Sequence, residues 1–273
     1  MESEGKVVVE MVGGRSTVTR CFSKYPLKFI VPNKGDSISC ELTVGDGCTA
    51  VLTTQASTKV YKSMGSKCSQ QVMETRVGSG AVLAVVPDPV TCFSTARYSQ
   101  KQVFRVVPDS NLVIVDWITS GRHESGEKWD FDLYKSTNHI FLEDDQPLFL
   151  DTVLLERGSI TSITERMQDY QVIAMVILMG PKMNHIQSQV QEDVKRIMSE
   201  QLRMPSTSLG RQIITKSDHC LMKPSFIASA SVFGPKGIGL VVRVAAMTTE
   251  SVYRFLQHQL ACLEPMLGVS PYR

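Results

Sequence analysis

Two polar segments carry the side chains best suited to chemistry. The first, residues 53–63, reads Thr-Thr-Gln-Ala-Ser-Thr-Lys-Val-Tyr-Lys-Ser and follows the apolar residues 50–52. A hydroxyl beside a lysine suits a Ser or Thr nucleophile whose base is that lysine. Ser57 or Thr58 with Lys59 therefore gives one hypothesis, a β-rich hydrolase. A Thr-rich strand with a solvated basic rim is the structural alternative.

The second segment, residues 121–127, reads Gly-Arg-His-Glu-Ser-Gly-Glu and follows Trp117. Arg122 and Glu127 can form a charge-assisted pair that fixes the loop or presents charge to a partner. The alternative is a polar hairpin loop in which both glycines permit a positive φ.

Residues able to bind a metal ion are present, but their spacing does not bring several of them to one point. Asp218, His219 and Cys220 are consecutive, and consecutive side chains of a strand point to opposite faces, so a buried Cys beside an exposed His is favoured. The acidic run 143–145 is typical of a solvated loop. The sequence thus predicts no dedicated metal site and leaves transient passage of an ion open.

Motifs for nucleotide and acyl chemistry are absent from the sequence. It contains no G-x-x-x-x-G-K-[ST] phosphate loop and no G-x-S-x-G elbow, and the glycines at 237 and 239 lack the third glycine of a dinucleotide site. The five histidines stand far apart, so spacing alone indicates no catalytic triad.

The elements that would position these residues are mostly strands. Residues 37–44 alternate apolar and polar side chains, and Trp129, Phe131 and Leu133 repeat that pattern. Continuous apolar runs predict more deeply buried strands at 7–12, 81–86, 112–118 and 172–179.

Two late segments change to helical spacing. The first begins at Asn184, with Gln187 completing a capping box, and places its apolar residues on one face: Ile186, Val190, Val194, Ile197 and Met198. The second follows Glu250, carries Val252, Phe255, Leu256, Leu260 and Leu263, and is stopped by Pro265. The prediction is a mainly β fold with two amphipathic α-helices in the C-terminal third.

Composition excludes several classes of protein. The 273 residues include 29 Lys and Arg against 27 Asp and Glu, a net charge of +2 that is too small and dispersed for a bulk grip on nucleic acid. Seven cysteines without a C-x-x-C pair favour a reducing, cytoplasmic compartment. The longest apolar run, 172–179, is far shorter than the roughly 20 residues that cross a bilayer, so no membrane association is expected.

Residues 35–40 (Gly-Asp-Ser-Ile-Ser-Cys) and 47–63 (Gly-Cys-Thr-Ala-Val-Leu followed by the first polar segment) closely resemble the hallmark of the UreD (UreH) family of urease accessory proteins, particularly its plant form. The Gly-Arg-x-x-x-Gly-Glu segment resembles the second hallmark of that family. The resemblance covers essentially the whole chain, as one UreD-like domain over residues 1–273.

The resemblance implies a stacked, superhelical β architecture and a non-enzymatic urease maturation factor. Such a factor binds apo-urease and UreF, and through UreF the GTPase UreG, and helps pass nickel to the urease active site. Nickel is then a transient cargo in a polar interior and no cofactor is tightly bound. The residues that match the family elements, as nickel path or partner contacts, are Asp36, Thr54, Lys59, Tyr61, Arg122 and Glu127. Of these, Asp36 and Glu127 are the candidates to hold a hydrated divalent ion briefly.

One departure from the family pattern precedes Gly35. Family members have a strand and a Gly-rich stretch before the Gly-Asp element, whereas here residues 26–34 run directly into it. The sequence therefore predicts a shortened chain in which the loss of a strand exposes an unpaired sheet edge.

Overall fold

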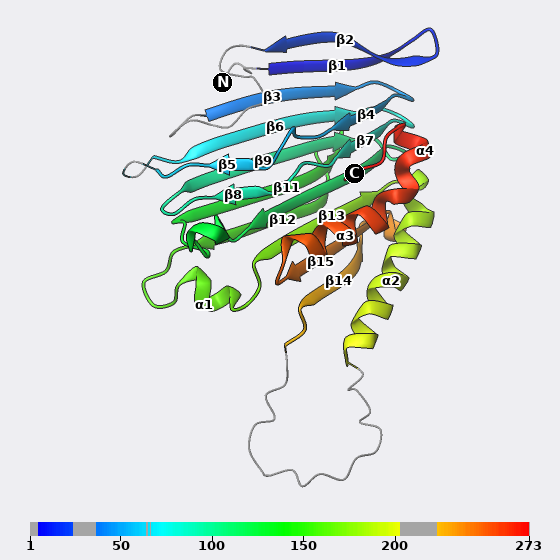
Figure 1. Cartoon of the computed structure of the whole chain (residues 1–273). Coiled ribbons are helices and arrows are strands. Elements are labelled where there is room, and N and C mark those ends of the chain that lie inside the picture. The colour runs from blue at the N-terminus through cyan, green and yellow to red at the C-terminus, as the bar shows by residue number, and fades with distance from the viewer. Residues whose placement is uncertain (1–4, 24–36, 64, 66, 203–222, 273) are drawn as a thin grey trace, which may run out of the picture.

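The structure, a computed structural model, describes residues 5–23, 37–63, 65, 67–202 and 223–272, and its strands form two stacked sheets (Figure 1). Sheet A has seven described strands in the order β12 (Pro147–Glu156), β11 (Leu133–Leu142), β9 (Arg97–Val106), β6 (Ser69–Val77), β3 (Ser37–Val44), β1 (Gly5–Val12) and β2 (Arg15–Ser23). Sheet B follows the order β14 (Phe226–Phe233), β15 (Gly239–Ala246), β13 (Val172–Met179), β10 (Asn111–Thr119), β7 (Val82–Val85) and β4 (Thr49–Leu52). Two short strands complete it, with β8 (Val90–Cys92) beside β10 and β5 (Thr58–Val60) beside β8.

The chain winds between the sheets as a solenoid. In sheet A, β1, β3, β6, β9 and β11 pair in parallel. From β3 to β11 the chain visits sheet B between successive strands of sheet A, and there β4, β7 and β10 also pair in parallel. Ser37 pairs with Gln70, Gln70 with Ser99 and Ser99 with Lys135, so coils of unequal length still stack in register. This unequal spacing explains why no fixed repeat is visible in the sequence.

Apolar side chains fill the space between the sheets over much of its length. Leu42, Val77 and Phe104 from sheet A pack with Leu83 and Ile114 from sheet B in one buried cluster. Each strand contributes every second residue to this core, as alternation requires.

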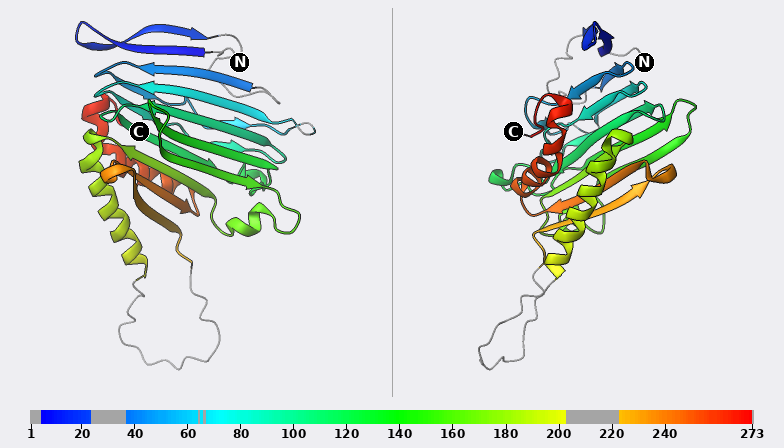
Figure 2. Two further views of the ribbon diagram at one scale, coloured as in Figure 1. Left: turned by 180° about the vertical axis from the view of Figure 1, so that it is seen from behind. Right: turned by 90° about the vertical axis from the view of Figure 1, so that its right-hand side faces the viewer.

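Helices cover the other face of sheet B (Figures 1 and 2). The described helices are α1 (Ile163–Met167), α2 (Asn184–Leu202), α3 (Thr249–Leu260) and α4 (Glu264–Leu267), with short 3-10 helices η1 (His123–Ser125), η2 (Pro181–Met183), η3 (Pro235–Gly237) and η4 (Ala261–Leu263). Val190 and Val194 of α2 and Leu256 and Leu260 of α3 are buried against sheet B residues such as Val242. The predicted mainly β fold with two amphipathic helices is confirmed.

Two predicted strands differ from the structure. Trp129 and Phe131 are buried, but they lie outside any strand because Trp129 has a φ of 54° and β11 begins only at Leu133. Residues 7–12 do form a strand, yet Met11 and Val12 are 45% and 54% exposed, so the prediction of a deeply buried strand is wrong there. Sheet B ends at β4, and no described strand of sheet B lies beyond it to cover β1.

Both helix boundaries also need correction. Asn184 is already in helical conformation because η2 leads into α2, and Gln187 donates to the carbonyls of Leu178 and Ile238 instead of completing a capping box. Helix α3 ends at Leu260, and Pro265 lies in the first turn of α4 instead of stopping the helix before it.

Candidate functional site

The first polar segment is held along the chain that leaves β7. Thr53 Oγ1 donates to the Val86 carbonyl at 3.0 Å, and Thr54 Oγ1 accepts from the Asp88 N–H at 2.8 Å. The Thr58 N–H then donates to the Pro89 carbonyl at 3.1 Å, where β5 begins to pair with β8. Thr54 is therefore a structural contact that fixes the path of residues 53–60 beside residues 86–92.

The two polar segments meet at Phe93. The Tyr61 ring lies edge-on to Phe93 with centroids 5.1 Å apart, and the Arg122 guanidinium lies 4.2 Å from the centroid of the same ring. Arg122 also donates twice to the Glu127 carboxylate, with Nε 3.1 Å from Oε2. Tyr61, Arg122 and Glu127, separate in sequence, thus form one cluster at the surface, which we call the Phe93 cluster.

Arg122 and Glu127 of the Phe93 cluster stabilise each other in their charged forms. The Arg122 hydrogen bonds lower the pKa of the Glu127 carboxyl, whose side chain is only 10% exposed, and raise the pKa of Arg122. A carboxylate with both oxygens engaged by one guanidinium is a poor ligand for a metal ion. The geometry favours Glu127 as the group that orients Arg122.

Lys59 lies apart from the Phe93 cluster in its contacts. It is exposed on β5, where it pairs with Thr91 of β8. Within the described contacts, Lys59 Nζ makes no hydrogen bond with Ser57 or Thr58, so the nucleophile and base of the hydrolase hypothesis are not joined. Asp36 lies outside the described residues.

Residues 86–88, which Thr53 and Thr54 contact, are also bound by Trp117 of β10 and by two tyrosines near the C-terminus. Trp117 Nε1 and the Tyr272 hydroxyl each donate to the Pro87 carbonyl at 2.8 Å, and the Tyr253 hydroxyl donates to Asp88 Oδ1 at 2.8 Å. Residues 87 and 88 therefore join the first polar segment, sheet B and α3.

The most buried polar cluster surrounds Asp116, a residue that the motifs did not single out. Asp116 points between the sheets and accepts from Gln100 Nε2 at 2.8 Å, Asn138 Nδ2 at 2.7 Å, the Tyr134 hydroxyl at 3.4 Å and the Ser136 hydroxyl. Burial raises the pKa of its carboxyl, while these four hydrogen bonds act in the opposite direction. We call Asp116 and its four donors the Asp116 network.

Polar groups continue from the Asp116 network toward the β12 edge of sheet A. Asn138 pairs with Asp151 across β11 and β12, and Arg243 of sheet B donates to Asp151 Oδ1 at 2.7 Å. A cavity of about 510 Å³ lies here, lined by residues of both sheets that include Asp116, Tyr134, Met175 and Arg243. Asn138 Oδ1 and Asp151 Oδ2 are buried without a hydrogen-bond partner among the described residues. The cavity is lined mainly by apolar side chains, and the two unpaired oxygens are buried beside it and not in its lining.

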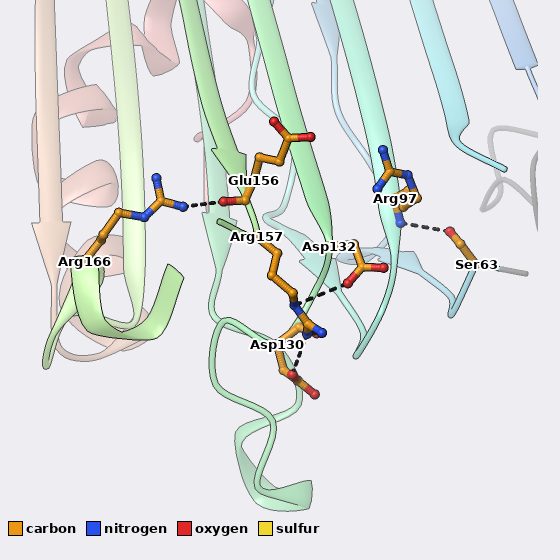
Figure 3. Close-up of polar contacts among 7 residues, drawn as sticks. All are labelled: Ser63, Arg97, Asp130, Asp132, Glu156, Arg157 and Arg166. Carbon is orange, nitrogen blue, oxygen red and sulfur yellow. Dashed lines mark hydrogen bonds and ion pairs between the residues drawn. The ribbon is translucent and has the colours of Figure 1, made fainter. Parts of the chain in front are cut away.

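Charged residues also lie near the start of β9 and the end of β12 (Figure 3). Arg157 bonds Asp130 Oδ1 at 2.8 Å and lies 3.3 Å from Asp132 Oδ1, and Arg166 donates to the Glu156 carbonyl. At the start of β9, the Arg97 N–H donates to Ser63 Oγ at 2.9 Å, which anchors the end of the first polar segment.

The remaining metal-ligand candidates from the sequence form no metal site in the described residues. In the acidic run 143–145, Asp145 forms an ion pair with Arg105 at the hairpin between β11 and β12. No group of three or more His, Cys, Asp or Glu able to hold a metal ion occurs in the described residues, and residues 218–220 lie outside them. Among the described helices, none has the length and apolar character needed to span a bilayer.

The Asp116 network was detectable only in part. A lone Asp inside the apolar run 112–118 is a signal, because a buried carboxylate needs hydrogen-bond donors. Its donors come from β9 and β11, and no spacing in the sequence indicates that these strands face Asp116. The sequence also did not predict that Tyr61 and Arg122 contact the same ring, because that ring, Phe93, belongs to neither polar segment.

Comparison with known proteins gives matches along the whole chain. The family model described as "UreD urease accessory protein" matches residues 2–273. The chain is 63% identical over 290 aligned positions to "Urease accessory protein D" of Arabidopsis thaliana, covering 98% of this chain and 99% of that protein. It is 58% identical to the protein of the same name from Oryza sativa subsp. indica, covering 98% and 94%, and 30% identical to "Urease accessory protein UreD" of Anaeromyxobacter sp., covering 98% and 88%.

The plant alignments span 290 positions, more than the 273 residues of this chain. Each of these relatives therefore has residues with no counterpart here. The expected loss before Gly35 stays a prediction.

Proposed function

Because the chain belongs to the UreD family of urease accessory proteins, with a role in urease maturation, we propose that it is a scaffold in the cytoplasm that binds apo-urease and UreF and helps pass nickel from UreG to urease. In this proposal residues 1–273 act as one UreD-like domain without turnover of their own. Nickel is the cargo, held only in transit.

The observation that supports passage is the group of buried polar side chains between the sheets. The Asp116 network and Asp151 place carboxylate, amide and hydroxyl oxygens beside the cavity, and such oxygens bind divalent ions weakly compared with thiolates and imidazoles. An ion that must leave again needs such ligands. Asn138 Oδ1 and Asp151 Oδ2, buried and unpaired among the described residues, are acceptors that a cation reaches only when the interior opens.

The observation that supports partner binding is the Phe93 cluster. Arg122 is 43% exposed, yet its direction is fixed by Glu127 and by the Phe93 ring. A pre-oriented arginine beside an exposed aromatic, here Tyr61 at 44%, is typical of the residues that dominate protein interfaces. We propose that this cluster contacts UreF or apo-urease.

Co-expression with apo-urease, UreF and UreG tests the scaffold role. Active, nickel-containing urease is expected only when this chain is present, and equal activation without it would refute the scaffold role.

Asn138→Leu tests passage separately, since it removes the amide while keeping the number and branching of the side-chain heavy atoms. This variant should still be captured by UreF but should load less nickel into urease. Ile140→Leu, two residues further along the same buried face of β11, is the matched control and should load normally. Full loading by the Asn138→Leu variant would reject passage through the interior while leaving the scaffold role intact.

A further inference from the structure

The two edge strands of sheet A differ in their protection against association. Strand β2 carries Arg15 and Arg20 and has a bulge opposite Val8 and Val9. Strand β12 has no Lys or Arg, its only proline is its first residue, Pro147, and its one register shift skips Leu148, before residues 150–154. Basic residues and bulges are the usual means by which proteins prevent edge strands from pairing with other chains. By this criterion β2 is a protected edge, whereas residues 150–154 of β12 have neither a basic residue nor a bulge.

The backbone groups that β12 leaves free can be identified. The Arg157 N–H donates to the Asp132 carbonyl, so every second residue back from Arg157 bonds toward β11. The Glu156 carbonyl points the other way, where Arg166 covers it (Figure 3). The N–H and C=O groups of Leu150, Thr152 and Leu154 therefore face outward, and no described strand pairs with β12 on that side.

Residues 150–154 read Leu-Asp-Thr-Val-Leu, which is symmetric in its outward-bonding positions about Thr152. In an antiparallel pair centred on Thr152, Leu150 of one copy faces Leu154 of the other, and Thr152 faces Thr152. Leu150 and Leu154 are 56% and 51% exposed, so the pairing would cover apolar surface that now contacts water. Asp151 faces Val153, and no like charges are opposed.

From this self-complementary edge we infer that two copies of the chain associate through antiparallel pairing of residues 150–154 about a two-fold axis at Thr152. The contact uses one strand from each copy and falls short of the roughly 1,200–2,000 Å² buried by stable interfaces. The dimer therefore forms in a concentration-dependent way, with a dissociation constant above about 1 µM.

Sedimentation velocity of the full chain between about 1 and 300 µM tests the inference. A dimer should appear at the upper concentrations and disappear in Thr152→Lys, which opposes two ammonium groups at the axis. Phe22→Lys is the matched control, because Phe22 is an exposed apolar residue, 54%, on the other edge strand of sheet A. A monomer at every concentration, or a dimer that survives Thr152→Lys, would overturn the inference.

Cross-linking tests the register. In a background with Cys21 and Cys262 changed to serine, Thr152→Cys should form a disulfide-linked dimer, because paired Cα atoms at the axis lie about 5.5 Å apart. Leu154→Cys should not, because its counterpart lies roughly 14 Å further along the partner strand. Equal cross-linking of both variants would contradict pairing centred on Thr152.

Discussion

Replacing Asp116 by alanine is expected to lower the free energy of unfolding by about 3 kcal/mol. The change removes the acceptor of four buried donors. Gln100 Nε2 retains Ser136 Oγ at 2.7 Å, and the Tyr134 bond is already long at 3.4 Å. The main penalty falls on the Ser136 hydroxyl and on Asn138 Nδ2, whose remaining bond to Ser136 Oγ is long at 3.5 Å. It is about 1–3 kcal/mol for each group and is partly offset because a buried carboxyl is also removed. A chain of this size then loses about 6–12 °C in melting temperature.

Thermal and urea unfolding followed by circular dichroism measure this loss, with Asp116→Asn as the matched variant. The asparagine keeps one acceptor oxygen, so about half of the loss is expected. A melting temperature unchanged in Asp116→Ala, or an equal fall in both variants, would refute this account of the network.

The pH dependence of Asp116 has a definite sign. Burial raises the pKa of its carboxyl in the folded state, so the folded chain keeps the proton to higher pH than the unfolded chain. Stability from this group is present below the unfolded pKa of about 3.9 and falls as pH rises through the folded pKa. The wild type should therefore lose stability relative to Asp116→Asn as pH rises from about 3 toward neutrality.

Three further changes have defined outcomes. Arg122 lowers the pKa of Glu127, so the stability from this pair is present above the unfolded pKa of about 4.3 and is lost as pH falls through the folded pKa. In melting curves recorded at a series of pH values, Glu127→Gln should weaken the loss of stability at acid pH. An unchanged loss in this variant would count against the pair. Tyr272→Ala removes a ring 6.0 Å from Trp117 and should shift tryptophan fluorescence and cost about 1–3 kcal/mol in urea unfolding, with Tyr272→Phe losing only the hydrogen bond. Gly180→Ala places a Cβ 2.2 Å from a backbone carbonyl oxygen at a φ of 105°, so a loss of more than about 3 kcal/mol is expected, and wild-type stability would contradict this geometry.

The sequence predicted those elements whose pattern is local. Apolar spacing identified α2 and α3 because each buries one stripe against sheet B, and alternation identified β3. It failed at residues 129–133, where burial of alternate side chains arises from a turn that aims Trp129 and Phe131 inward without any strand pairing. Period-2 burial alone does not distinguish these two cases.

The candidate site was predictable only where both partners lie in one segment. Arg122 and Glu127 are five residues apart, and their pairing was expected and is observed. The contact of Tyr61 with Phe93 depends on the pairing of β5 with β8, and the donors to Asp116 depend on the register of β9 and β11. Since the coils differ in length, no constant offset in the sequence reveals which residues become neighbours.

The geometry separates two tasks that a polar interior can serve. Asp116 is the most buried carboxylate of the described residues, yet four donors occupy its oxygens, and a lone pair engaged by a donor is not available to an ion. On the proposed route, Asp116 therefore holds β10 against β9 and β11, and the free acceptors are Asn138 Oδ1 and Asp151 Oδ2, which an ion contacts only when the interior opens because both atoms are buried. Arg243 bonds only Asp151 Oδ1 and leaves the second oxygen facing the interior, where its positive charge also weakens cation binding. Weak binding at that position is what a route requires, because an ion that is held tightly inside the chain does not reach urease.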